Sequence, residues 1–375
     1  MYLFLFALLL IPAGCSRNSA DPEEIAAIFA RHSYAENDPS AVKRAFAAGK
    51  PSLLRAVDPH TAVISPDDRP GRDYPGVLKA GAGAYLWLKG GGLLVAKVFP
   101  GSPAEAAGLK EGDLINMLDS RPIAGIPAPE VLASLYGTKG GEFAFEGVKK
   151  DGSALSGSLK REFGSYPLVW SFMVPGEKTA YLRLVSFTAK TPELVRNELA
   201  ALTAAGARGV IIDLRNNYGG SLEALADTLA LFAPGPGTLF KADSRHRGYS
   251  KEFSTQKAGA FSGLRLALLT GSGTVSKAEI FAASLAEAGR AVTAGGATAG
   301  NVSVTKTFRL KRGGALRMTV ARLLTPGGKD LEGKGLPPDL PVEDPLDGEY
   351  AFAADFPAPV ASADPVLAAA LKKLK

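Results

Sequence analysis

Cysteine and histidine are scarce in this chain: its 375 residues include one cysteine and three histidines. A structural zinc site takes four ligands, nearly always cysteine or histidine, and the single cysteine, Cys15, belongs to an apolar leader. Too few soft ligands therefore remain for a structural zinc site. We expect no metal and no cofactor.

Long runs of one charge are also missing. The 43 basic and 37 acidic residues give a formal net charge of +6 and are scattered along the sequence, apart from a small basic cluster at Lys372, Lys373 and Lys375. A nucleic-acid-binding surface needs a concentrated basic patch, so we expect no nucleic-acid partner. The hydrophobic content of 46% and the charged content of 21% describe a globular protein, and the length allows two or three domains.

The N-terminal apolar run, from Tyr2 to Pro12, is too short to cross a bilayer, and it is followed by Ala13, Gly14 and Cys15. Residues 1–15 resemble a bacterial lipoprotein signal, whose cysteine is lipidated and becomes the mature N-terminus. The resemblance implies an exported protein of the bacterial periplasm or cell envelope, tethered to a membrane through Cys15. A plain signal peptide or a short anchor is the alternative.

Residues 16–75 are predicted to form a polar tether and then a helical arm. Apolar residues recur at helical spacing over residues 23–31 and 41–48. The arm closes in a turn, Asp58-Pro59-His60-Thr61, that carries one of the three histidines. A histidine in such a turn is either a structural residue or a candidate base.

Between residues 76 and 163 glycine is frequent and short predicted strands alternate with turns. Residues 93–118 resemble a PDZ domain through the motifs Pro-Gly-Ser-Pro-Ala, Ala-Gly-Leu and Gly-Asp-Leu-Ile. PDZ domains bind an extended peptide as an added strand and hold its terminal carboxylate on backbone N–H groups of a glycine-rich loop. The resemblance implies a peptide-binding site made by the loop 80–84, the strand after it and an apolar pocket, with the residues Gly81, Ala82, Gly83, Tyr85, Leu109 and Ile115. A module used only as an intramolecular lid or spacer is the alternative.

In residues 164–375 predicted strands and helices alternate. We expect strands at 181–187, 209–214 and 264–269, and helices at 191–204, 221–232 and 364–375. This succession predicts an α/β fold with a mostly parallel sheet and helical crossovers, in which functional groups gather beyond the carboxyl ends of the strands. The pair Gly219-Gly220 and the residue Ser276 both lie at such ends.

Ser276 opens a helix after a buried strand and a glycine-rich turn. The helix dipole and the unpaired backbone N–H groups at a helix N-terminus favour a developing negative charge, so a hydroxyl there suits a nucleophile. The alternative is an N-cap serine whose partner Glu279, three residues on, completes a capping box.

Three motifs of this region look like the carboxyl-terminal processing protease and tricorn-core family of serine peptidases. They are Ile211 to Asn217 with Gly219-Gly220, the Ser276 helix, and Gly335-Leu336-Pro337-Pro338-Asp339. The resemblance implies a ClpP/crotonase-like core and a serine endopeptidase with Ser276 as nucleophile. Backbone N–H groups of Gly219, Gly220 and Lys277 would hold the oxyanion. The substrates would be polypeptides delivered by the PDZ domain, through their C-termini in one version of this hypothesis.

The sequence departs from the processing branch of this family at the catalytic lysine. That branch has a Ser–Lys dyad, and the matching position here is Asn301, whose amide cannot accept the serine proton at neutral pH. The tricorn-like branch resembles a Ser–His–Glu site instead, which implies His60 as the base and Glu332 as its partner.

Three other possibilities stay open. Lys306 is a candidate displaced lysine. Lys277 adjoins the serine but is expected to point about 100° away from it along the helix, which makes it a poor base. A catalytically inactive peptide-binding lipoprotein, acting as a PDZ adaptor or scaffold, is the second reading of the whole chain.

Overall fold

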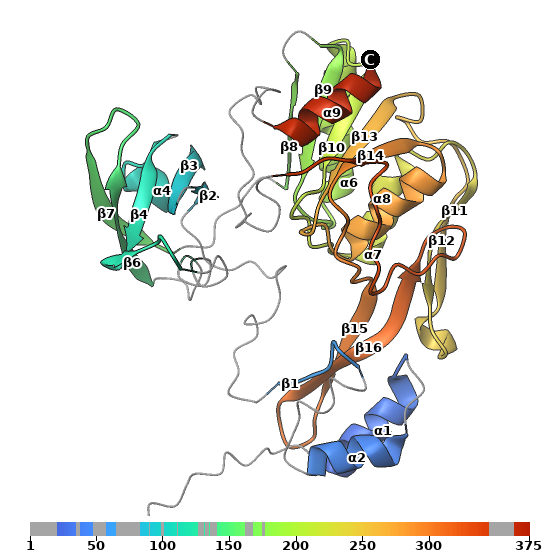
Figure 1. The fold of residues 1–375 in the computed structure, drawn as a ribbon. Coiled ribbons are helices and arrows are strands. Elements are labelled where there is room, and N and C mark those ends of the chain that lie inside the picture. The colour runs from blue at the N-terminus through green and yellow to red at the C-terminus, as the bar shows by residue number, and fades with distance from the viewer. Residues whose placement is uncertain are drawn as a thin grey trace, which may run out of the picture. The chain divides into compact units, whose positions relative to one another are not determined.

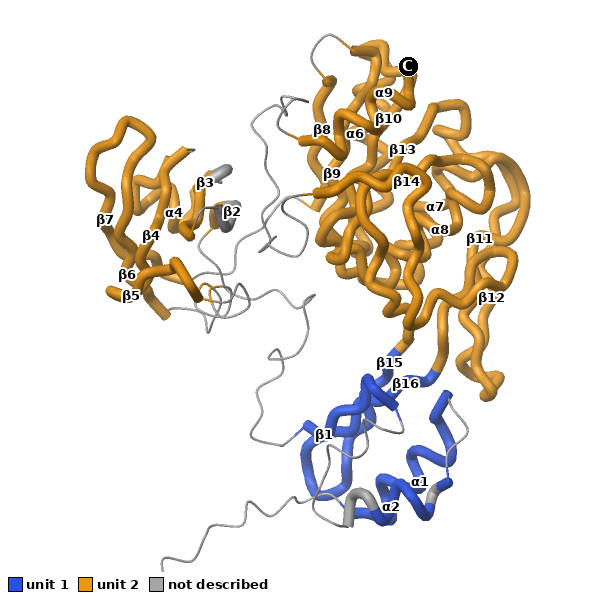
Figure 2. Tube along the Cα trace, in the orientation of Figure 1, with its two compact units in different colours: residues 1–70, 305–320 blue, residues 71–304, 321–375 orange. Residues whose placement is uncertain are grey.

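The computed structural model describes residues 21–34, 38–47, 58–64, 83–89, 91–98, 101–110, 112–126, 131, 135, 141–161, 168–174, 177–344 and 364–375 (Figure 1). The predicted leader with Cys15 lies outside the described residues. The chain divides into two units, residues 1–70 with 305–320 and residues 71–304 with 321–375 (Figure 2). None of the helices in the described ranges is both long and apolar enough to span a membrane.

The first unit contains the two predicted helices of the N-terminal arm, α1 (Pro22–His32) and α2 (Pro39–Ala47). Asp21 caps α1 by accepting the N–H of Glu23, and a proline follows at the first helical position. The apolar face of α1, Ile25 and Phe29, packs with Met318 in one hydrophobic cluster. The same unit holds β1 (Ala62–Ile64), which pairs antiparallel with the first residues of β16 (Ala315–Leu324).

The predicted PDZ region is a separate antiparallel sheet with its own core. Its strand order is β2-β3-β4-β6-β7, with β5 paired to β4. The bounds are β2 (Ala84–Lys89), β3 (Gly92–Val98), α4 (Pro103–Ala106), β4 (Leu114–Leu118), β5 (Arg121–Pro122), β6 (Glu142–Val148) and β7 (Ala154–Lys160). Phe143, Phe145 and Leu159 are buried in its core. The alternation of buried and exposed residues along β6 matches a sheet with one face on the core.

The second sheet is the mostly parallel one that the sequence predicts. Its order is β17-β14-β13-β10-β9-β8, parallel throughout except for the edge pair β8/β9. The strands are β8 (Val169–Met173), β9 (Thr179–Leu184), β10 (Gly209–Asp213), β13 (Arg265–Thr270), β14 (Ala291–Gly295) and β17 (Leu340–Pro341). The helices around it are α6 (Thr191–Ala204), α7 (Leu222–Ala230), α8 (Lys277–Glu287) and α9 (Pro365–Leu374).

Alternate residues of these strands point to two different hydrophobic cores. In β10, Val210 and Ile212 pack with residues of α6, α7 and α8, whereas Ile211 packs with residues of α9. This period of two explains why the central strands are hydrophobic at every position: both faces of the sheet are covered. The α/β fold with helical crossovers is therefore confirmed.

A further, antiparallel sheet was not predicted. It has the order β1-β16-β11-β12, with β15 (Ser303–Arg309) also paired to β16. β11 (Gly237–Asp243) and β12 (Lys251–Thr255) form a hairpin whose turn carries the 3-10 helix η2 (Arg247–Tyr249). The long strand β16 contributes residues 315–320 to the first unit and residues 321–324 to the second.

Candidate active site

The loops that follow β10 and β13 meet at the carboxyl edge of the parallel sheet. β10 and β13 are neighbours, so their loops leave the sheet side by side. The N–H of Val275 donates to the carbonyl of Asn217 at 2.9 Å, and the hydroxyl of Thr274 donates to the carbonyl of Leu214 at 3.1 Å. These bonds bring the segment with Gly219-Gly220 to the start of α8, as the motifs predict.

Asn217 holds the glycine segment in shape. Its side chain is fully buried, its amide donates to the carbonyl of Leu184 at 2.9 Å, and its oxygen accepts the N–H of Gly219 at 2.8 Å. The N–H of Gly219 is thus already engaged within its own loop. This is a correction to the predicted oxyanion site, because a donor bonded to a buried amide oxygen is not open to an oxyanion.

Gly220 forms an isolated parallel bridge with Phe187. The N–H of Phe187 donates to the carbonyl of Gly219, and the N–H of Ser221 donates to the carbonyl of Phe187. In a parallel bridge the central residue turns its own N–H to the opposite edge, so the N–H of Gly220 faces away from Phe187. The predicted donors that remain are Gly220 and Lys277, the first helical residue of α8, whose N–H has no acceptor within the helix.

Ser276 has a backbone conformation unlike the other serine caps of this chain. Ser102 and Ser221 begin helices with φ of −88° and −79°, in the usual extended region, whereas Ser276 has φ 63° and ψ −119°. A non-glycine residue in this region is strained, and such strain persists only where the surroundings fix it, most often at functional sites. The capping-box alternative is therefore incomplete as an account of Ser276, even though Glu279 does accept its N–H at 3.0 Å.

Gly219 lies directly against the candidate nucleophile. A Cβ at residue 219 would stand 3.2 Å from the Cβ of Ser276 and 3.0 Å from the backbone nitrogen of Lys277, and Gly219 has φ 92°. Both the space and the backbone conformation therefore require glycine.

Glu279 joins the start of α8 to the loop 298–301. Its side chain is fully buried and accepts four hydrogen bonds. One oxygen accepts the N–H groups of Ser276 at 3.0 Å and Asn301 at 2.8 Å; the other accepts the Thr298 hydroxyl and the Gly300 N–H, both at 2.6 Å. The sequence predicted only the bond to the helix start, since the other three partners are distant along the chain.

Glu332 binds the next residue of the same loop. Its carboxylate accepts the N–H of Val302 at 2.9 Å, and the N–H of Gly333 donates to the carbonyl of Gly300 at 2.7 Å. Two carboxylates thus hold consecutive N–H groups, those of Asn301 and Val302. The structure brings Ser276, Glu279, Asn301 and Glu332 into one network, and the pairing of Glu332 with His60 stays a prediction.

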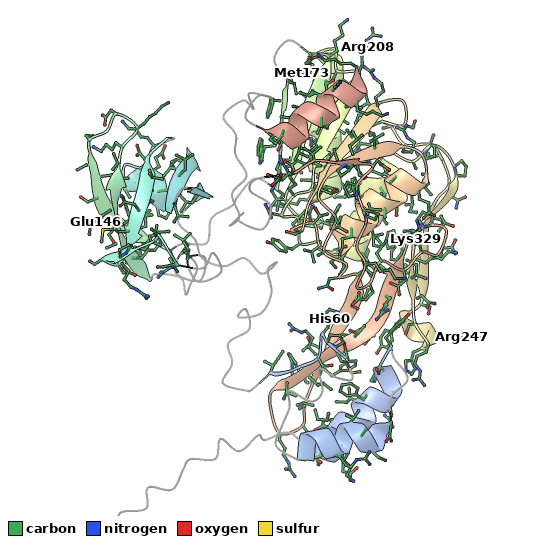
Figure 3. The ribbon with its side chains drawn as sticks, viewed as in Figure 1. His60, Glu146, Met173, Arg208, Arg247 and Lys329 are labelled. Atoms are coloured by element: carbon green, nitrogen blue, oxygen red, sulfur yellow. The ribbon has the colours of Figure 1, made fainter. Side chains whose placement is uncertain are left out.

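His60 is fixed by a buried aspartate in the first unit. Asp58 accepts the N–H of His60 at 3.0 Å and both the N–H and the hydroxyl of Thr319, at 2.7 and 2.9 Å. This ties the turn to β16, and His60, labelled in Figure 3, is partly exposed. Ser276 belongs to the second unit, and the pairing of His60 with Ser276 stays a prediction. Lys306, on β15 of the first unit, places its ammonium 5.8 Å from the centre of the Phe308 ring.

A buried ion-pair network lies at the end of β10. Asp213 pairs with Arg183 at 2.6 Å and with Arg215 at 2.7 Å, and Arg215 also binds Asp344 and Asp364. Despite the opposing effect of burial, the two guanidinium groups hold the pKa of Asp213 well below its usual range. The sequence predicts no role for these residues, although two opposite charges at the end of a buried strand were a signal for such a pair.

Comparison with protein-family models finds two domains. Residues 77–143 match the PDZ domain and residues 178–342 match peptidase family S41. Residues 178–342 are thus similar to peptidase family S41. This confirms the resemblance given by the Gly219-Gly220, Ser276 and Gly-Leu-Pro-Pro-Asp motifs.

The proteins that this chain resembles carry related names. The carboxyl-terminal-processing protease of Synechocystis sp. is 32% identical over 251 residues, which are 66% of this chain and 58% of that protein. The carboxy-terminal processing protease CtpA of Bacillus subtilis is 28% identical over 291 residues, 77% of this chain and 61% of that protein. The chain therefore spans about three fifths of the length of these relatives. A putative S41 protease from Bacteroides fragilis shares the fold with a TM-score of 0.64 and 20% identity, over 94% of this chain and 96% of that one.

The structure describes part of the predicted peptide-binding site of the PDZ domain. Gly83 has φ 75°, and a Cβ there would overlap the Cβ of Ser102 at 2.3 Å, so the end of the predicted carboxylate loop packs tightly on the start of α4. The backbone of Tyr85 pairs with Lys97 in the sheet. Leu109 and Ile115 are buried in the PDZ core. Gly81 and Ala82 lie outside the described residues.

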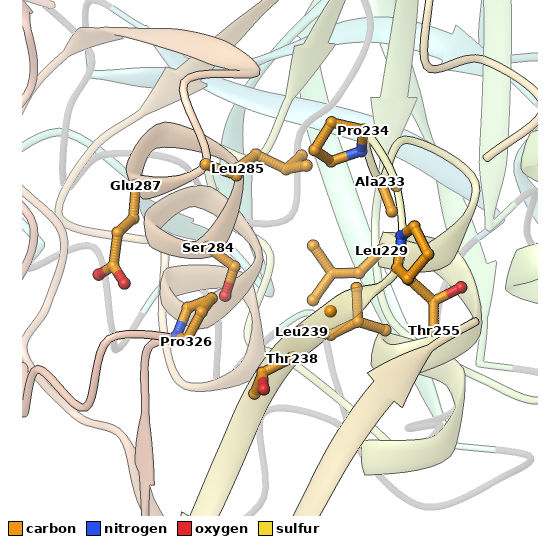
Figure 4. A pocket seen from close by; sticks show the side chains of 14 residues that line it. Leu229, Ala233, Pro234, Thr238, Leu239, Thr255, Ser284, Leu285, Glu287 and Pro326 are labelled. Atoms are coloured by element: carbon orange, nitrogen blue, oxygen red, sulfur yellow. The ribbon is translucent and has the colours of Figure 1, made fainter. Parts of the chain in front are cut away.

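A pocket of about 150 Å³ lies elsewhere, between the end of α7, the start of β11 and the second half of α8 (Figure 4). Its lining includes Ser284, Leu285 and Glu287 of α8, so it begins eight residues, or about 12 Å of helix, beyond Ser276. It is therefore not the site of the nucleophile. The described residues contain no cluster of three or more side chains suited to a metal.

Proposed function

We propose that this chain is a serine endopeptidase that hydrolyses peptide bonds of polypeptides, with Ser276 as its nucleophile. One observation carries the proposal: Ser276 holds a strained backbone conformation at the start of α8, directly against Gly219. An ordinary N-cap does not need strain of this kind. A nucleophilic serine does, because its hydroxyl must point away from its own helix.

The proposed reaction follows the Ser–His–Glu pattern. His60 accepts the Ser276 proton as the hydroxyl oxygen attacks the carbonyl carbon, and the N–H groups of Gly220 and Lys277 stabilise the resulting oxyanion. The imidazolium gives this proton to the leaving amine, the C–N bond breaks, and an acyl ester of Ser276 remains. A water molecule, deprotonated by the same histidine, then hydrolyses the ester and restores the serine. Glu332 orients the imidazole and stabilises its charged form.

The PDZ domain would deliver the polypeptide by binding its free C-terminus as an added strand. The carboxylate would meet the backbone donors near Gly83, and amidation of a bound peptide would therefore weaken it. We place the protein outside the cytoplasm, in the bacterial periplasm or cell envelope, held to a membrane by a lipid on Cys15. The leader with Ala13-Gly14-Cys15 supports this location, and mass spectrometry of the mature N-terminus tests it.

Asn301 favours a second candidate function. Because the lysine of the processing branch is absent, the fold would also suit a peptide-binding protein without catalytic activity. This candidate keeps the PDZ domain and the glycine segment but assigns no reaction to Ser276.

The deciding experiment measures labelling by a fluorophosphonate probe and cleavage of an unfolded protein. Ser276→Ala should abolish both. His60→Ala should reduce cleavage nearly as much, by roughly 10⁶-fold, because nucleophile and base act as one unit. Glu332→Gln should reduce it less, and wild-type activity should fall in the acidic range where an imidazole becomes protonated. Lys306→Ala is the matched control and should keep wild-type activity. If the wild type neither labels nor cleaves, the peptide-binding candidate is correct.

A further inference from the structure

Lys277 turns its side chain back across the glycine beside the nucleophile. The Cδ of Lys277 and the Cβ of Ser276 each lie 3.2 Å from the point that a Cβ of Gly219 would occupy. The two carbons are therefore within about twice that distance of each other. Consecutive residues of a helix point about 100° apart, but this does not apply to Ser276 and Lys277, because Ser276, with φ 63°, is not part of the helix.

The ammonium of Lys277 is a cation that lacks an acidic neighbour in the described part of the chain. The side chain is half-buried, and burial alone lowers the pKa of Lys277. None of the ion pairs between described residues includes it. The closest acidic residue along α8, Glu279, already accepts four hydrogen bonds. A partly desolvated charge without a partner is costly, and an arriving anion would remove that cost.

Resting on the proposed peptidase function, we propose that the Lys277 ammonium binds a carboxylate of the substrate next to the scissile bond. The carboxylate would come from an aspartate or glutamate side chain near that bond, or from the terminus of a chain cut close to its end. Lys277 would then have two separate roles: its backbone N–H holds the oxyanion, and its side chain selects the substrate. A lysine suits the second role because its flexible stem can follow a carboxylate at more than one position.

The test uses peptides blocked by N-terminal acetylation and C-terminal amidation. They are compared in pairs that differ at one position around the cleaved bond, with Asp in one peptide and Asn in the other, or Glu and Gln. The measured quantity is the ratio of kcat/KM between acid and amide partners in one enzyme, so that any general loss of activity cancels. For the wild type we expect a ratio of about 10 to 100 at one position, the size of a charge-assisted hydrogen bond. A third set with free C-termini, cut near the end, separates the terminal carboxylate from the side-chain carboxylate.

Three variants set the expected outcomes. Lys277→Met should bring the ratio close to 1, and Lys277→Glu should invert it in favour of amide or basic residues. Lys329→Met is the matched control, because Lys329 is an exposed lysine of the same domain (Figure 3), and it should keep the wild-type ratio. Lys277→Met removes a partly desolvated charge, so the variant should unfold at a temperature no lower than the wild type. A changed ratio could then not be assigned to misfolding.

The proposal and the function on which it rests can fail separately. A wild type that cleaves acid and amide peptides equally overturns the role of the Lys277 side chain and leaves the peptidase intact. A Lys277→Met variant that loses kcat on every peptide, with a shifted pH profile and an unchanged ratio, also overturns it and assigns Lys277 to proton transfer. If the wild type does not cleave, the peptidase function fails. The role of the Lys277 side chain is then tested by binding the same peptides to Ser276→Ala and comparing the Kd values of acid and amide partners. Equal Kd values overturn that role.

Discussion

Replacing Glu279 by glutamine should damage both the stability of the peptidase core and the reactivity of Ser276. The carboxylate accepts hydrogen bonds from the N–H groups of Ser276, Gly300 and Asn301 and from the hydroxyl of Thr298. An amide offers one oxygen in place of two, and its NH₂ group must face either two N–H donors or an N–H and a hydroxyl. The substitution changes almost no volume, so its effect reports the hydrogen bonds rather than packing.

The magnitude follows from the four bonds. In the better orientation of the amide, the NH₂ group meets Gly300 and Thr298, the threonine hydroxyl rotates to accept, and the N–H of Gly300 is left without a partner. A buried donor without a partner costs about 1–3 kcal/mol, and the remaining bonds lose their charge assistance, which is worth a further 1–2 kcal/mol. We therefore expect a loss of about 2–5 kcal/mol, which corresponds to a fall in Tm of roughly 4–20 °C for a domain of this size.

Thermal unfolding and the rate of fluorophosphonate labelling measure the two effects. The control is Glu287→Gln on the same helix, because Glu287 is exposed and accepts the N–H of Gly327, a bond that an amide can keep. It should stay within about 0.5 kcal/mol of the wild type. If Glu279→Gln unfolds and labels like this control, the carboxylate does not hold the site together, and the reasoning from its hydrogen bonds is wrong.

Two further predictions concern residues around the nucleophile. Gly219→Ala should abolish labelling of Ser276, because the new Cβ would press on Ser276 and on the N–H of Lys277. The control is Gly206→Ala: Gly206 has φ 100°, so the substitution causes the same backbone strain, but the space around its Cβ is open. This control should be labelled normally. Asp213→Asn should cost about 3–5 kcal/mol in denaturant unfolding, since it removes the buried carboxylate that Arg183 and Arg215 share. Because the folded state lowers the pKa of Asp213, this stabilisation is complete above the unfolded pKa of about 3.9 and is lost as the pH falls toward the lower folded value. The free-energy difference between wild type and Asp213→Asn should therefore be constant at neutral pH and shrink in strong acid; a constant difference down to pH 2 would contradict the ion-pair argument.

Much of the fold could be predicted because its signals are local. The helix predicted at residues 191–204 is α6, and the predicted strand 209–214 differs from β10 by one residue. The parallel sheet followed from the alternation of such strands and helices. The position of Ser276 at a helix start followed from the glycine turn and the apolar spacing after it.

The antiparallel sheet could not be predicted, because its pairs join residues far apart in the sequence. β1 meets β16 through residues such as Val63 and Leu316, and no local pattern encodes that partnership. The same limit applies to the site. The capping box of Glu279 is visible within four residues, but its bonds to Gly300 and Asn301 depend on the folded sheet. The positive φ of Ser276 is likewise set by surroundings that the sequence does not display.

The carboxylates of Glu279 and Glu332 bind the loop at Asn301 and Val302 through main-chain N–H groups. Every amino acid except proline carries that donor, so the loop keeps its shape whichever side chain stands at position 301. A lysine and an asparagine are therefore interchangeable there as far as folding is concerned. Within one family, the proton acceptor could move from one part of the fold to another by single substitutions, with each intermediate protein still able to fold.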